Sequence, residues 1–173
     1  TAILVTGASG LLGRALMREL GSRPDTTITG TALRRHADPL IRLDLLASGE
    51  VQRVVRDLRP DVIVHSAAER HPDICEKLPG SVTALNVDAT RTLARAAADT
   101  GAWMVYISTD YVFDGTSPPY RIGDTPNPVN LYGMSKLQGE LVTRECLPDH
   151  AILRVPILYG PVETLDESPV TSI

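Results

Sequence analysis

The chain has 173 residues, 43% hydrophobic and 22% charged, and its 17 Lys and Arg against 21 Asp and Glu give a net charge of −4. This composition is too apolar for a disordered chain, the length allows a core without disulfide or metal staples, and the mild acidity argues against a nucleic-acid or anionic-membrane surface. With two cysteines, no apolar run long enough to cross a bilayer and no visible secretory signal, we expect a globular domain in the reducing cytoplasm.

Short apolar runs alternate with longer segments of helical period along the chain. The expected strands lie at 2–6, 26–31, 41–43, 62–66, 103–108 and 151–155. The expected helices lie at 11–21, 51–58, 81–100 and 131–147. Pro60 ends the second helix, and a proline-bearing loop precedes the last one. Strand–helix alternation at this spacing predicts α/β architecture with a doubly wound parallel sheet, the Rossmann fold.

A glycine-rich turn of GxxGxxG spacing joins the first expected strand to the first expected helix. Glycines there permit a tight turn, close approach of the backbone to a pyrophosphate, and close packing of helix on sheet. The helix N-terminus adds unpaired N–H groups and a positive dipole end. A Walker loop needs a second glycine five residues after the first, but Leu12 lies five residues after Gly7, and Arg14 stands where that loop needs Ser or Thr, so a Walker loop is excluded. The residues that we expect at the pyrophosphate are Gly7, Ser9, Gly10, Leu11, Leu12 and Gly13.

The end of the second expected strand indicates which nicotinamide cofactor would bind. An NAD site usually places Asp or Glu there for the ribose 2′-OH, but no acid follows this strand and Arg34 and Arg35 do. Guanidinium groups suit the 2′-phosphate of NADP (NADPH) through charge-assisted hydrogen bonds. The alternative is a solvated basic loop, because all but two of the 17 basic residues are Arg. The pattern favours NADP.

Tyr132 and Lys136 open the last expected helix one turn apart, on one face. A phenol with a pKa of about 10 is a poor acid–base catalyst at neutral pH, and an adjacent ammonium favours the phenolate and lowers that pKa. The alternative is an ordinary surface pair. Because only Lys77 and Lys136 are lysines, an ordinary exposed basic position would more often be Arg.

Ser108 and Thr109 end the fifth expected strand at its carboxyl side, the edge where open α/β sheets bind ligands. A hydroxyl there can donate to a substrate carbonyl while Tyr132 delivers a proton. Taken alone, Ser-Thr at a strand end is also a common helix or turn cap.

Other polar positions leave alternatives open. His65, His71, Asp73 and Cys75 lie within eleven residues, but their spacing matches no recognised metal-ligand pattern. We therefore expect no metal site there, and a structural or substrate-loop role instead.

Three places near the expected cofactor are equally open. Asn86 is either a solvated residue, or one that hydrogen-bonds a backbone carbonyl and positions Lys136 through water. Ala67 and Ala68 either leave room for a cofactor or simply pack tightly. Arg154, at the end of the last expected strand, is either a structural ion pair or a ligand contact.

These motifs, in this order, resemble the extended short-chain dehydrogenase/reductase family over essentially the whole chain. Residues 108–116 and 131–136 resemble its dTDP-4-dehydrorhamnose reductase branch. The resemblance implies NADPH-dependent reduction of a 4-keto nucleotide-activated sugar, with Thr109, Tyr132 and Lys136 as the catalytic set. It implies an NADP-binding domain at 1–160 and, at 161–173, the start of a substrate-binding region that this chain largely lacks. The cofactor residues are then the six of the glycine-rich turn with Arg34, Arg35, Asp44, Leu45, Ala67, Ala68, Glu69, Asn86, Tyr132, Lys136 and Arg154.

A second resemblance concerns the segments 62–73 and 153–160, which are similar to the regulatory beta subunits of methionine adenosyltransferase. These belong to the same branch, bind NADP and associate with a catalytic subunit. In the reductases the segment at 69–73 usually reads differently. The expected partner is accordingly a nucleotide-sugar substrate or the catalytic subunit of methionine adenosyltransferase, with a homodimer as a further arrangement. The intact Thr, Tyr and Lys set puts the reductase first and the regulatory subunit second.

Overall fold

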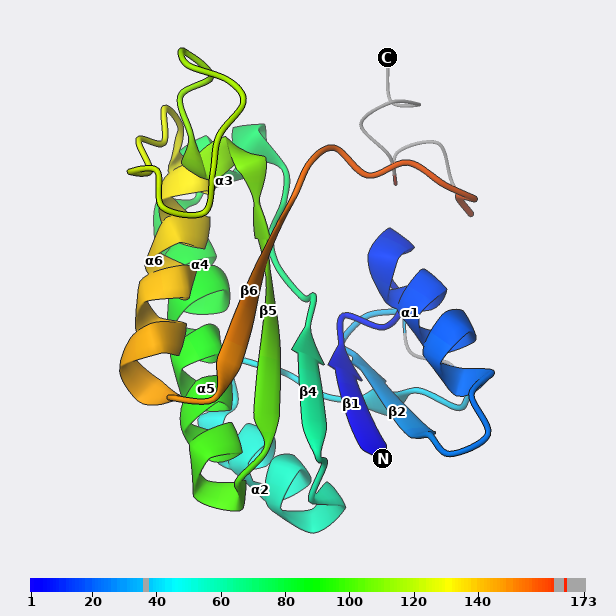
Figure 1. Ribbon diagram of the computed structural model, residues 1–173. Coiled ribbons are helices and arrows are strands. Elements are labelled where there is room, and N and C mark those ends of the chain that lie inside the picture. Colours follow the sequence, from blue (N-terminus) through cyan, green and yellow to red (C-terminus); the bar gives the residue numbers. More distant parts are fainter. Residues whose placement is uncertain (36–37, 164–166, 168–173) are drawn as a thin grey trace.

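The computed structural model describes residues 1–35, 38–163 and 167, and its centre is one parallel sheet of six strands (Figure 1). The strands are β1 (Ala2–Thr6), β2 (Thr27–Ala32), β3 (Ile41–Arg42), β4 (Val62–His65), β5 (Trp103–Thr109) and β6 (His150–Val155). They lie in the order β3-β2-β1-β4-β5-β6, and the order reverses between β1 and β4. This is the Rossmann arrangement, so the predicted fold class is confirmed.

Helices cover both faces of the sheet: α1 lies on one face, and α2, α5 and α6 lie on the other (Figure 1). The helical segments are α1 (Leu11–Gly21), α2 (Ser48–Leu58), α3 (Pro72–Lys77), α4 (Pro79–Thr83), the π-helical η1 (Ala84–Asp88), α5 (Ala89–Thr100), the 3₁₀ turn η2 (Asp110–Val112) and α6 (Leu131–Cys146). Within the described residues no helix is long and apolar enough to cross a membrane.

The apolar core is divided by the sheet. Leu4 of β1 packs with Ile63 and Leu93 in the larger cluster, on the side of α2 and α5. Val5, the next residue of β1, packs with Val64 in a smaller cluster on the other side. Successive strand residues point to opposite faces, so a strand covered on both faces must be apolar throughout. That explains the short unbroken apolar runs in the sequence.

Two predicted elements differ from the structure. The helix expected at 81–100 begins at Pro79 and contains a π-helical turn at 84–88, and the second helix begins at Ser48 instead of Val51. The helix α3 was not expected, because in six residues with Ile74 exposed and Cys75 buried no apolar stripe repeats. All other predicted boundaries lie within one residue of those observed. Of the segment 161–173, residues 164–166 and 168–173 lie outside the described part.

Candidate functional site

The three glycines of the turn between β1 and α1 play different structural parts. Gly7 has φ +70°, and a Cβ on it would lie 2.8 Å from the backbone of Ala67. A Cβ on Gly13 would overlap the carbonyl oxygen of Gly7 and lie 2.7 Å from Cα of Ala8. A Cβ on Gly10 would meet one atom within 4 Å, at 3.3 Å. The outer glycines therefore allow the tight turn and the close packing, while Gly10 leaves the surface of the turn open, as a pyrophosphate site requires.

The first turn of α1 keeps donors free for an anion. Gly10 is its N-cap residue, and no side chain of the described residues caps the helix. The N–H of Arg14 donates to the carbonyl of Gly10 at 2.9 Å, and this bond closes the first turn. The N–H groups of Leu11, Leu12 and Gly13 come before it in the helix, have no acceptor within the helix, and lie at the positive end of the helix dipole. The local geometry fits a diphosphate.

The two predicted arginines after β2 do not act together. Arg35 forms an ion pair with Glu167, and so does Arg14 at the start of α1. Arg34 is exposed, and in the described part of the chain no ion pair is recorded for it. The arginine that accompanies Arg35 is therefore Arg14, which the sequence pattern did not single out.

Asp44 and Leu45, the two residues expected beside the adenine, differ in their exposure to solvent. The side chain of Asp44 is half-buried, and its Oδ1 accepts a hydrogen bond from the N–H of Leu46 at 2.9 Å. Leu45 is buried in the larger core cluster. Of the two side chains, only Asp44 borders the surface.

Asn86 holds the segment after β4, where Ala67, Ala68 and Glu69 lie. Its Oδ1 accepts from the N–H of Glu69 at 2.8 Å, and its Nδ2 donates to the carbonyl of Glu69 and to Oγ of Ser135, each at 3.0 Å. Asn86 is fully buried, so the solvated alternative is wrong. This side chain ties the loop at the carboxyl end of β4 to α6.

Thr109 and Tyr132 are brought together at the end of β5. The hydroxyl of Thr109 lies close enough to Tyr132 to lower the pKa of the phenol, and it donates to Oδ1 of Asp110 at 3.2 Å. Thr109 also accepts from the N–H of Tyr111 at 3.2 Å and so caps η2, which confirms the capping interpretation, while the catalytic role stays a prediction. Asn130 caps α6 by accepting from the N–H of Gly133 at 2.7 Å. A Cβ on Gly133 would overlap the carbonyl oxygen of Tyr111, so this glycine lets α6 start directly against η2.

Lys136 is buried, not a member of a surface pair. Its side chain is 3% exposed, and Nζ lies 4.2 Å from the centre of the Tyr106 ring. Burial lowers the pKa of Lys136 to about 7, against the opposing charge of Glu140. Burial also raises the pKa of Tyr132 to about 12, and the nearby hydroxyl of Thr109 opposes this only in part. The shift of the phenol is opposite to the one expected, because the loss of hydration outweighs the groups that favour the phenolate, Thr109 and Arg70.

The burial of Lys136 predicts a pH effect on stability. An unfolded lysine titrates near 10.5 and the folded one near 7, so between these values the unfolded state binds more protons and stability rises with pH. We expect Lys136→Met to be the more stable protein at pH 7 by on the order of 2 kcal/mol, and its advantage to shrink toward pH 10. Urea unfolding at both pH values measures this difference.

The exposed Lys77 of α3 supplies the control. Lys77→Met should change stability little and equally at both pH values. Tyrosines and cysteines also titrate in this pH range, but the wild type and both variants contain the same ones, so their contributions cancel in the stability differences. A pH-independent difference between Lys136→Met and the wild type would contradict the burial argument.

A buried ion pair beneath the site was not expected. Glu140, one turn after Lys136, is 0% exposed and accepts from Nε and Nη2 of Arg154 at 2.8 and 2.7 Å, and from Oγ of Ser108 at 2.6 Å. Although burial opposes it, these hydrogen bonds lower the pKa of Glu140. Of the two predicted roles of Arg154, a structural ion pair or a ligand contact, the structure therefore shows the ion pair. An acid four residues after Lys136, on the same helix face, was the available signal.

The His and Cys residues of the 65–75 segment are separated in space. His65 is buried, with Nδ1 2.7 Å from Oγ1 of Thr6 and Nε2 3.0 Å from Oγ1 of Thr90. Burial lowers the pKa of His65 to about 3, so its ring is neutral. Nδ1 of His71 lies 2.8 Å from Oε1 of Glu69 instead. In the described residues, no group of three or more His, Cys, Asp or Glu side chains could hold a metal ion.

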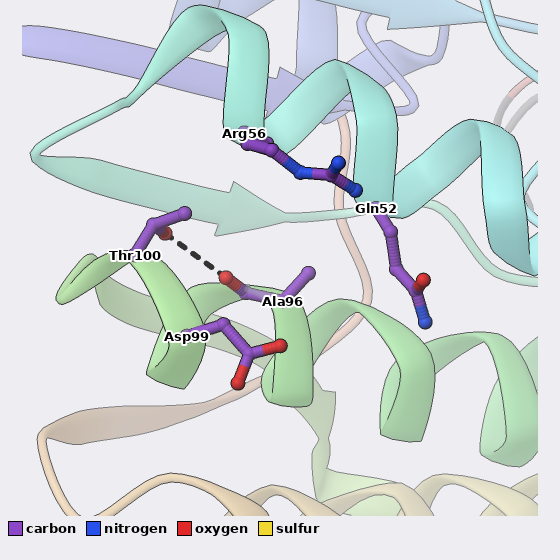
Figure 2. Close-up of a pocket in the computed structure, with 5 residues that line it drawn as sticks. All are labelled: Gln52, Arg56, Ala96, Asp99 and Thr100. Atoms are coloured by element: carbon purple, nitrogen blue, oxygen red, sulfur yellow. Dashed lines mark hydrogen bonds between the residues drawn. The ribbon is translucent and has the colours of Figure 1, made fainter.

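Two shallow hollows in the described surface lie apart from the glycine-rich turn. The larger, of about 160 Å³, lies between α2 and α5 (Figure 2) and is lined by Gln52, Arg56, Ala96, Asp99 and Thr100. The hydroxyl of Thr100 donates to the carbonyl of Ala96 there, at 2.9 Å. A smaller one, of about 100 Å³, lies beside the start of α6, between Cys75 and Ser135. None of the predicted site residues lines the larger hollow.

Comparison with known families decides where the chain belongs. Residues 1–165 match the family model described as the RmlD substrate binding domain. The chain belongs to this RmlD family. This agrees with the resemblance to the dTDP-4-dehydrorhamnose reductase branch.

RmlD-family relatives of two kinds match the chain. Methionine adenosyltransferase 2 subunit beta of Bos taurus is 50% identical over 98% of the chain and 50% of the relative, and that of Danio rerio is 49% identical over 98% and 51%. A dTDP-4-dehydrorhamnose reductase of Sinorhizobium fredii is 39% identical over 91% of the chain and 51% of the relative. The chain spans about half the length of the curated relatives it matches.

Solved structures of the RmlD family share the fold. The dTDP-4-dehydrorhamnose reductase of Bacillus anthracis, in complex with NADP, is 35% identical, with a TM-score of 0.85 over 94% of this chain and 56% of that one. The orthologue of Clostridium acetobutylicum is 33% identical, with a TM-score of 0.86 over 95% and 56%.

Proposed function

We propose that this RmlD-family chain is the nucleotide-binding part of a regulatory beta subunit that assembles with the catalytic subunit of methionine adenosyltransferase. The observation that carries the proposal is the identity of 47–50% to beta subunits over 97–98% of the chain, against 39% to a reductase over 91%. This similarity favours the second of the two predicted functions over the first.

We infer that residues 1–160 bind NADP. In support, the turn at Gly10 is open, the first turn of α1 has free donors, and Arg35 lies at the end of β2. Asp44 would border the adenosine, while Ala67, Ala68 and Glu69 would line the cofactor beyond the pyrophosphate. The reductase of Bacillus anthracis, which shares the fold, holds NADP. In a regulatory subunit, NADP would stabilise the folded chain, because it binds the folded state and not the unfolded one.

A second candidate function is reduction of a 4-keto nucleotide-activated sugar, and the contact of Thr109 with Tyr132 favours it. When bound, NADPH would supply the hydride. Tyr132 would hold the proton for the developing alkoxide, and its raised pKa keeps the phenol protonated at neutral pH. Thr109 would polarise the carbonyl, and Lys136 would bind the ribose. A fold recruited for regulation can retain this set, so the set does not separate the two functions.

One experiment separates them. We expect the full-length protein, with saturating NADP, to co-purify with the catalytic subunit of methionine adenosyltransferase and to change its methionine kinetics. Tyr132→Phe should assemble as the wild type does, because the phenolic oxygen belongs to the chemistry alone. Absence of binding, together with turnover of dTDP-4-dehydrorhamnose and NADPH that Tyr132→Phe abolishes, would overturn the regulatory assignment and establish the reductase.

A further inference from the structure

Two arginines from separate elements meet on one carboxylate beside the glycine-rich turn. Arg14 of α1 contacts Glu167 through both terminal nitrogens, with Nη1 3.1 Å from Oε1 and Nη2 2.6 Å from Oε2. Arg35, after β2, donates to the same Oε1. The described chain after β6 runs past the sheet toward α1 (Figure 1). The ion pair of Glu167 with Arg14 lies beside the start of that helix.

Further hydrogen bonds fix the positions of Arg14 and Glu167 in this arginine site. Nη1 of Arg14 also donates to the carbonyl of Ser9 at 2.8 Å, which fixes the guanidinium against the glycine-rich turn. The N–H of Glu163 donates to Oε2 of Glu167 at 2.9 Å. Glu167 is 5% exposed, so its carboxylate is enclosed by three donors. Arg14 with its neighbours thus forms an anion site that holds an anion from its own chain.

The site is also electrically balanced. The carboxylate of Glu163 lies 3.5 Å from Arg14 and 4.0 Å from Arg35, so two guanidinium groups face two carboxylates. A neutral cluster offers no net attraction to a further anion. An entering phosphate group must therefore take the place of a carboxylate.

We propose that Arg14 and Arg35 together form the site of the 2′-phosphate of NADP, and that Glu167 is its competitor within the chain. The proposal rests on the NADP binding proposed above. A phosphate monoester carries about −1.5 to −2 charges and three acceptor oxygens, enough for two guanidinium forks. NAD lacks this group and cannot displace the carboxylate. Glu167 therefore lowers the preference for NADP over NAD, and Arg14, rather than Arg34, is the second phosphate ligand.

Isothermal titration of the full-length protein with NADP and with NAD tests the competition. Glu167→Gln keeps the size of the side chain and removes its charge, so it should tighten NADP binding by about tenfold, which corresponds to one lost charge-assisted pair, and leave NAD unchanged. Glu19→Gln is the matched control, because Glu19 lies on α1, the helix of Arg14, and pairs with Arg18 outside the site. It should change neither affinity.

The arginines are tested in the same way. Arg14→Gln and Arg35→Gln should each weaken NADP binding by about tenfold with little effect on NAD, and Arg34→Gln should weaken it less. An unchanged NADP-to-NAD ratio in Glu167→Gln, or a loss in Arg14→Gln no larger than in Arg34→Gln, would overturn the assignment.

A smaller probe separates this proposal from the proposed function. Adenosine 2′,5′-bisphosphate carries the phosphate in question and 5′-AMP does not. Glu167→Gln should tighten binding of the bisphosphate alone. If the wild type bound neither dinucleotide, the proposed cofactor would be wrong, and tightening of the bisphosphate would still support the arginine site. Equal effects on both adenosine probes would overturn that site.

Discussion

Gly13→Ala should destabilise the protein by about 3 kcal/mol or more, the upper range for overpacking a dense site. A Cβ at this position would overlap the carbonyl oxygen of Gly7 and come within 2.7 Å of Cα of Ala8. Both atoms belong to the backbone, so no side-chain rotation relieves the overlap, and α1 must move away from β1. Because that movement opens the turn, NADP binding should be lost with the stability. Urea unfolding and nucleotide titration of the full-length protein measure the two effects.

Gly49→Ala is the matched control for this substitution. Gly49 lies in α2, is exposed, and has no atom within 4 Å of the position a Cβ would take. Alanine there should stabilise the helix by about 0.5–1 kcal/mol, because glycine loses more conformational freedom. Equal stabilities of Gly13→Ala and Gly49→Ala would show that the close approach of α1 to β1 is not required.

Arg154→Met should cost about 3 kcal/mol, because it leaves the fully buried Glu140 without its bidentate partner. Arg144, at 3.5 Å and half exposed, replaces that partner poorly. The folded-state pKa of Glu140 is lowered, so the pair stabilises the wild type above the unfolded pKa of about 4.5 and loses its effect as pH falls through the folded value. The gap between variant and wild type should therefore be largest near pH 7 and shrink below pH 4.5.

The exposed pair of Arg91 and Glu145, at 2.9 Å, provides the comparison. Arg91→Met should cost much less, since solvent screens this pair. The double variant Arg154→Met with Glu140→Leu should recover most of the stability lost in the single variant, because no charge is then left buried. A double variant as unstable as the single one would show that packing, not the unpaired charge, determines the loss.

Patterns local in the chain predicted most of the fold and part of the site. The strands at β1 and β4 were recognisable because a strand buried on both faces is apolar throughout. The spacing of Gly7, Gly10 and Gly13 predicted the turn, because the close approaches at Gly7 and Gly13 involve backbone within a few residues or next to the adjoining strand β4. Helix α3 and the π-helical turn of η1 escaped prediction, because neither has a repeating apolar pattern of its own.

The sequence by itself determined the parallel sheet, the glycine-rich turn at its switch point, and the positions of Thr109 at a strand end and Tyr132 at a helix start, because short-range periodicity and turn chemistry specify these. Only the tertiary structure decided which charges meet. Arg14 and Glu167 are 153 residues apart, and Glu140 finds Arg154 across the edge of the sheet. It also decided the direction of the Tyr132 pKa shift, since that depends on burial. Pairing and hydration are properties of the packed chain, and no local pattern encodes them.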